Sequence, residues 1–139
     1  MSCNFNLMDT FNQVAADLLR FYGPDGDGLS EEDINQWSEL TGLNRATLYD
    51  QIALHLAHGF HANEMPFEFC DRIVNAIHGV ITLAGEDWPE IFWATFLAFD
   101  EGEYYHQSNP EEDPVELFTK PQIADIVVKY GAHKSPHKA

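Results

Sequence analysis

One stretch decides the fold of this chain: Trp88-Pro-Glu-Ile-Phe-Trp-Ala-Thr-Phe-Leu-Ala-Phe-Asp-Glu-Gly-Glu-Tyr-Tyr-His106. Pro89 suits the first turn of a helix, and Asp87 before it can cap the free N–H groups. Apolar side chains then recur at spacings of three and four and cover most of the helix surface. Such a helix normally packs against neighbours on all sides. We therefore predict a buried aromatic helix over residues 88–101, ended by Gly102, with the rest of the chain wrapped around it.

Apolar stripes at helical spacing predict further helices over residues 5–22, 30–40, 45–58 and 66–84, and a last one between a Thr119 cap and Gly131. We expect Ser30 and Asp33 to form a capping box and Asn44 to cap the next helix. The fold class predicted is a single-domain, all-α bundle of about six helices spanning residues 1–131. Residues 132–139 form a short basic tail that we expect to be disordered.

The charge of the chain is strongly acidic and unevenly distributed. The 139 residues carry a formal net charge of −16, with 23 Asp and Glu against 7 Lys and Arg, while 45% of residues are hydrophobic. This composition is typical of a globular domain. An acidic body repels nucleic acid and anionic membranes and attracts cations or basic proteins. The alternative is that the charge only maintains solubility.

Cysteine content and hydropathy bear on where in the cell the protein is expected. Cys3 and Cys70 are too few for a disulfide framework, and no N-terminal basic-then-apolar signal is visible. No apolar run approaches the roughly 20 residues of a membrane-spanning helix. We therefore expect a cytoplasmic location and no membrane partner.

The segment from Asp25 to Asp33 resembles part of an EF-hand calcium loop. Asp25, Asp27 and Gly28 fit positions 3, 5 and 6 of such a loop. The first and last ligands do not fit, because these positions fall on Gly23 and Ile34. A turn followed by the Ser30–Asp33 capping box is the interpretation that we favour.

Residues 39–49, Glu-Leu-Thr-Gly-Leu-Asn-Arg-Ala-Thr-Leu-Tyr, resemble the turn and second helix of a helix-turn-helix DNA reader. Such a protein needs basic side chains for phosphates and base edges, and this stretch offers only Arg45. Since acidic residues surround it, a helix-turn-helix regulator remains an alternative, and we predict no nucleic-acid binding.

Four potential metal ligands follow within ten residues: His55, His58, His61 and Glu64. A spacing of three or four can place two ligands on one helix face. We expect Gly59 to break the helix between them, and the spacing matches no familiar zinc signature. A metal-binding domain or metalloenzyme that uses this cluster is a second alternative, and a structural role is the interpretation that we favour.

The acidic end of the aromatic helix is the predicted binding site. It comprises Asp100, Glu101, Glu103, Tyr104, Tyr105 and His106, continued by residues 111–113. Tyrosine is enriched at binding hot spots, and surrounding carboxylates steer a cationic partner toward it. The alternative is a solvated helix end whose tyrosines only seal the core. No catalytic constellation or phosphate loop stands out, so we predict no enzyme activity and no cofactor.

These features predict an acidic interaction domain with a basic protein partner. Small acidic helical immunity proteins, which mask cationic toxins, are similar in character, although no motif aligns with them. The resemblance implies an immunity-like or antitoxin-like role. Neither the identity of the partner nor the oligomeric state follows from the sequence.

Overall fold

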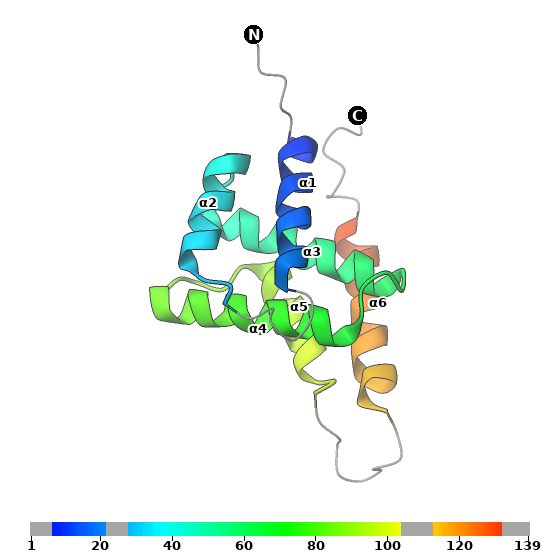
Figure 1. Ribbon diagram of the computed structural model, residues 1–139. Coiled ribbons are helices and arrows are strands. Elements are labelled where there is room, and N and C mark those ends of the chain that lie inside the picture. Colours follow the sequence, from blue (N-terminus) through cyan, green and yellow to red (C-terminus); the bar gives the residue numbers. More distant parts are fainter. Residues whose placement is uncertain (1–6, 22–27, 104–112, 132–139) are drawn as a thin grey trace.

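The computed structural model describes residues 7–21, 28–103 and 113–131, and every regular element in these ranges is helical (Figure 1). The elements are listed here in chain order: α1 (Leu7–Leu18), the 3-10 helix η1 (Leu19–Phe21), α2 (Glu31–Thr41), α3 (Arg45–His61), α4 (Phe67–Ala84), α5 (Glu90–Asp100), the π-helical turn η2 (Val115–Thr119) and α6 (Lys120–Tyr130). The predicted all-α bundle is confirmed. Within the described residues, no helix combines the length and the apolar character needed to cross a membrane.

The centre of the bundle is shared by α3 and α5. α5 packs against α3, α4 and α6, and α3 also contacts α2 (Figure 1). α3 buries nine side chains or glycines: Leu48, Tyr49, Ile52, Ala53, Leu54, Leu56, Ala57, Gly59 and Phe60. Its small residues allow neighbouring helices to approach closely. The central position of α3 was not predicted, because its apolar residues are less bulky than the aromatic residues of α5.

The aromatic helix is shorter and less enclosed than predicted. α5 spans Glu90–Asp100, and Phe92, Thr95, Phe96, Ala98 and Phe99 are buried. Two large apolar side chains of this segment, Trp88 before α5 and Leu97 within it, remain partly exposed, with 40% and 39% of their surface open to solvent. The prediction that this helix packs against neighbours on all sides is therefore wrong for one side of α5.

Two predicted caps are also wrong. Asp87 makes no capping hydrogen bond to α5, which begins after Pro89 and receives its cap from Asp50 on α3: the Phe92 N–H donates to Asp50 Oδ1 at 2.8 Å. Thr119 does not cap α6, since the helical path begins earlier, at Val115, and the Thr119 hydroxyl donates to the Ala98 carbonyl at 2.8 Å.

Other local predictions are confirmed. The Ser30 N–H donates to Asp33 Oδ2 at 2.9 Å, as in a capping box. Asn44 caps α3 through a 2.8 Å hydrogen bond from the Thr47 N–H. Gly42 ends α2 with φ of 77°, a left-handed conformation that glycine adopts without steric cost.

Gly59 does not break α3, which continues to His61. The residue is buried, and a Cβ atom built on it would lie 2.6 Å from the Met65 sulfur. The glycine thus permits the chain after α3 to fold back against the helix. Gly59 is therefore not a helix breaker. It is the position at which Met65 packs closely against α3.

Candidate binding site at the end of α5

The predicted binding residues Asp100, Glu101 and Glu103 lie where α5 ends and the chain turns (Figure 1). Tyr104, Tyr105 and His106 fall outside the described residues, as do residues 111 and 112 of the proposed continuation. Asp113 is described and exposed, and its carboxylate accepts a 3.0 Å hydrogen bond from the Val115 N–H, so it caps the next helical turn.

Gly102 fixes the path of this turn. Its N–H donates to the Phe99 carbonyl at 3.0 Å, and the next N–H, of Glu103, donates to the Asp100 carbonyl at 3.1 Å. A Cβ atom on Gly102 would lie 2.3 Å from Thr119 Oγ1 and 2.9 Å from the Phe67 ring. The start of α4 and the turn before α6 therefore close on this glycine from two sides and hold the flanking carboxylates in place.

The turn sends its carboxylates to different neighbours. Glu101 accepts a 2.6 Å hydrogen bond from Gln122 Nε2 on α6. Glu103 accepts a 2.9 Å hydrogen bond from Asn75 Nδ2 on α4. The predicted site is thus divided, with Glu101 on the α6 side and Glu103 on the α4 side.

Asp71 on α4 completes a group of three carboxylates with Asp100 and Glu103. Burial, a hydrogen bond to the Glu103 carboxyl and the negative charges of Glu103 and Asp100 raise the pKa of Asp71 to about 8. Its Oδ1 atom is buried without a hydrogen-bond partner among the described residues. Within that part of the chain, no Lys or Arg forms an ion pair with Asp71 or Glu103. We call Asp71, Asp100 and Glu103 the carboxylate cluster.

Asp71 was not among the residues predicted for this site. The available signal was the i, i+4, i+7 spacing of Asp71, Asn75 and His78, which places these polar residues along one side of the helix. The meaning of this spacing depends on how α5 lies against α4, and this arrangement is a tertiary property.

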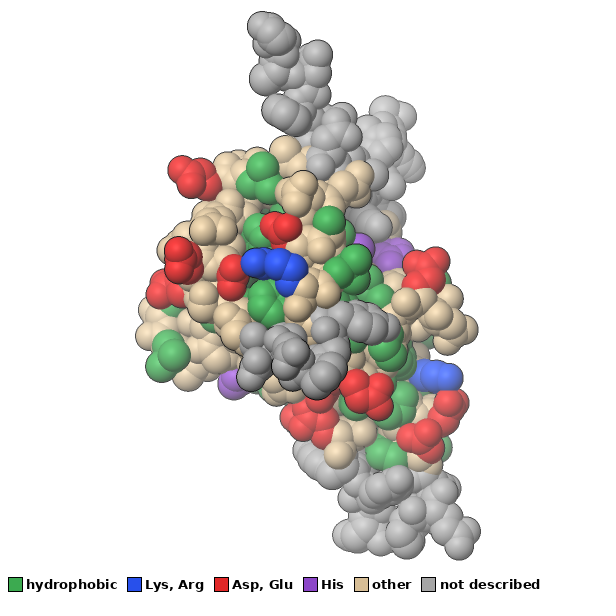
Figure 2. Space-filling view, viewed as in Figure 1, with side chains coloured by type: hydrophobic (Ala, Val, Ile, Leu, Met, Phe, Trp, Pro, Cys, Tyr) green, Lys and Arg blue, Asp and Glu red, His purple; other side chains and the backbone are tan. Residues whose placement is uncertain are grey.

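The basic side chains within the described ranges are occupied by contacts inside the molecule. Arg20 pairs with Asp33 at 3.2 Å, and Lys120 pairs with Glu116 at 2.8 Å. Arg72 Nη1 donates to the Phe21 carbonyl at 2.6 Å, and Lys129 lies 5.1 Å above the Tyr130 ring. Figure 2 shows the resulting surface, on which separate groups of Asp and Glu side chains surround few basic ones.

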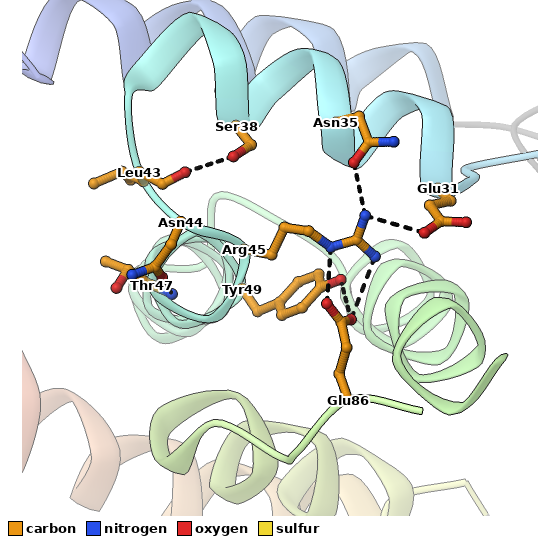
Figure 3. Close-up of polar contacts among 9 residues, drawn as sticks. All are labelled: Glu31, Asn35, Ser38, Leu43, Asn44, Arg45, Thr47, Tyr49 and Glu86. Atoms are coloured by element: carbon orange, nitrogen blue, oxygen red, sulfur yellow. Dashed lines mark hydrogen bonds and ion pairs between the residues drawn. The ribbon is translucent and has the colours of Figure 1, made fainter. Parts of the chain in front are cut away.

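Arg45, the fifth of these residues, is held in a network between α2, α3 and the segment after α4 (Figure 3). Its Nε donates to Glu86 Oε2 at 2.8 Å, Nη1 contacts Asn35 at 2.7 Å, and a Glu31 oxygen lies 3.1 Å away. The Tyr49 hydroxyl donates to the same Glu86 carboxylate at 2.7 Å. α2 and α3 are joined by a short connection at residues 42–44, but Arg45, the one basic side chain of the stretch that resembles a helix-turn-helix, points into the molecule.

The metal-ligand candidates are placed apart. The His55 ring packs edge-on against Phe11 at 5.7 Å, while His58 lies against the end of α6, next to Gly131. His61 and Glu64 are exposed. Among the described residues, no three His, Cys, Asp or Glu side chains are arranged to hold a metal ion. Asp25 and Asp27 of the possible calcium loop lie outside the described ranges.

Comparisons of the chain with protein-family models, curated proteins and solved structures find no match.

Proposed function

We propose that this protein is an acidic interaction domain that binds a basic protein partner. The carboxylate cluster at the end of α5 is the site proposed for a cationic side chain of that partner. Asp71 and Glu103 have no cationic partner among the described residues, while the Lys and Arg side chains there are engaged within the molecule. This contrast is the observation that carries the proposal.

The chemistry of the cluster favours an incoming cation. Like-charged carboxylates held close together raise one another's pKa, and a positive charge nearby favours their ionised form. A lysine or arginine of the partner would replace the proton that the cluster otherwise retains. Binding near neutral pH would then release a proton, and the affinity would rise as the pH increases toward 8.

The wider acidic surface supplies the long-range part of the interaction. A net charge of −16 attracts a basic protein before contact and increases the association rate, with a strong dependence on salt. An immunity-like or antitoxin-like role, in which the acidic domain masks the active surface of a cationic toxin, is the specific form of the proposal. A cytoplasmic location fits this role.

Affinity capture from the source lysate would test the proposal, with the wild-type protein and an Asp71→Asn/Glu103→Gln variant as baits. Because the pKa of Asp71 is about 8, the cluster variant removes about one negative charge near neutral pH, and an exposed Glu39→Gln variant on α2 serves as the matched control. Captured candidates would be purified and their association rates measured at low and physiological salt. We expect a partner of net positive charge whose association slows about tenfold with the cluster variant and less than about twofold with the control.

A captured partner of neutral or negative charge, bound equally well by all three baits, would contradict the proposal. The same conclusion would follow if the cluster and control variants slowed association equally, because the effect would then reflect net charge and not this site.

A further inference from the structure

α4 and α5 lie side by side and antiparallel, and together they present one continuous face. The order of the contacts shows this direction: His78 stacks on Phe96 at 4.4 Å, while Asn75, earlier on α4, meets Glu103, later along the chain than α5. One end of the face is therefore aromatic and the other end carries the carboxylate cluster.

The aromatic end is built from stacked rings. The His78 ring lies between Trp88 and Phe96, with centroid distances of 4.7 and 4.4 Å. Trp88 also packs against Trp93 at 4.9 Å, which fits a hydrophobic staple across the start of α5. This staple explains the position of Trp88 but leaves 40% of the residue exposed. The result is a partly exposed tryptophan that packs against two neighbouring rings, so little side-chain freedom is left to lose when a ligand binds.

The two ends are joined along the outer side of α5. Trp93, Leu97 and Asp100 follow the spacing i, i+4, i+7 and share one side of that helix. Leu97 is 39% exposed and lies between the aromatic and acidic ends. Seven helical residues span about 10.5 Å, and the same interval separates His78 from Asp71 on α4.

We propose that this α4–α5 face docks an amphipathic helix of a basic protein, with an apolar side chain of that helix against Trp88 and Trp93 and a Lys or Arg among Asp71, Asp100 and Glu103. The inference rests on the proposed function and specifies its partner. A helix that presents an apolar residue and a basic residue seven positions apart matches the spacing of the two ends.

Charge complementarity selects this occupant over a second copy of the chain. A second copy brings another net charge of −16, which opposes association. Covering Glu103, which has no cationic partner among the described residues, without supplying a cation would also bury charge without compensation, which is costly. A basic amphipathic helix satisfies both ends, because it buries the exposed tryptophan surface and neutralises the carboxylates.

Two designed peptides of the same composition would test whether an apolar and a basic residue must lie seven positions apart on one face of the docked helix. Each has about 18 residues, mostly Ala and Gln with blocked ends, which is long enough to form a helix. In the matched peptide, two Leu and one Arg share one face with the Arg seven positions from the first Leu. In the mismatched peptide, the Arg lies on the opposite face. Binding would be measured by titration calorimetry at low salt, and the folding of every protein variant would be checked by circular dichroism.

We expect the matched peptide to bind about tenfold more tightly than the mismatched one. Trp88→Ala and Glu103→Gln should each remove most of this preference, whereas Glu39→Gln on α2 should leave it unchanged. Leu97→Gln alters an exposed position and gives an independent reading if Trp88→Ala fails to fold.

The possible failures are distinguishable. If both peptides bind equally, the docking face is wrong while the proposed attraction of basic partners stands. If neither binds at low salt, both proposals fail. If the protein forms a dimer that Trp88→Ala abolishes, a second copy occupies the face and the inference is overturned.

Discussion

Asp50, in the middle of α3, caps the first turn of α5 by accepting a 2.8 Å hydrogen bond from the Phe92 N–H. Burial raises the pKa of Asp50, and hydrogen bonds from the backbone of Phe92 and Ile91 act in the opposite direction. A cap normally comes from the residue just before the helix. Here it comes from 42 positions earlier, so the start of α5 and the middle of α3 are held together.

Asp50→Ala should destabilise the fold by about 1–2 kcal/mol, because α5 loses its cap and a buried N–H loses its acceptor. Asp50→Asn should cost less, since the amide oxygen can still accept the bond. Urea denaturation at neutral pH measures both changes. Asp87→Ala removes the cap expected from the sequence and is the control, with an effect within about 0.5 kcal/mol. Equal losses for Asp50→Ala and Asp87→Ala would contradict the tertiary cap.

Gly102 and Gly79 should respond in opposite ways to substitution by alanine. Gly102→Ala forces a Cβ atom against Thr119 and Phe67 and should cost about 1–3 kcal/mol through overpacking. At Gly79, in the interior of α4, a Cβ atom meets no described atom within 4 Å. Gly79→Ala should therefore stabilise the protein by about 0.5–1 kcal/mol through helix propensity. Thermal unfolding of the pair checks this, and a stable Gly102→Ala variant would show that the turn can relax.

Asp71→Asn should stabilise the protein at high pH and have little effect at low pH. The pKa of Asp71 is about 8 in the folded state against an ordinary value of 3.8, so the folded state binds the proton more tightly. The resulting stabilisation is fully present below about pH 4 and is lost as the pH rises through about 8. Asparagine removes this dependence, because it never ionises.

We expect the gain from Asp71→Asn to reach about 1–2 kcal/mol at pH 9, well below the full value of the shift because the cluster can relax. Unfolding midpoints measured from pH 4 to pH 9 for both proteins provide the test. Glu39→Gln serves as the charge control. If stability depended on pH in the same way for wild type and Asp71→Asn, the raised pKa of Asp71 in the carboxylate cluster would be ruled out.

The protein should not hold duplex DNA at physiological salt, although residues 39–49 resemble the turn and second helix of a helix-turn-helix DNA reader. Arg45 is bound to Glu86 and Glu31, and phosphate contacts require free positive charge. Fluorescence anisotropy with a random-sequence duplex measures the affinity. Glu86→Gln removes one of the two carboxylates that pair with Arg45. It serves as the control for whether this ion pair masks DNA binding by Arg45. Sub-micromolar binding by the wild type would contradict the prediction.

Much of the fold follows from local features of the sequence. Helical periodicity gave the all-α class, Asn44 caps α3 as expected, and Gly42 and Gly85 end helices close to the predicted ends at residues 40 and 84. These signals succeed because a cap or a left-handed glycine acts within one helical turn. The acidic end of α5 was likewise visible as a run of carboxylates.

Tertiary structure alone decided how these elements cooperate. Asp50 reaches α5 across 42 positions, and Asn75 reaches Glu103 across 28, so no local pattern could indicate either contact. Gly59 was misread for the same reason, because its role depends on Met65 packing against it. Periodicity reports which face of a helix is apolar, whereas the neighbour that covers this face is set by packing of the whole chain. The carboxylate cluster is therefore a product of how α4 and α5 pack.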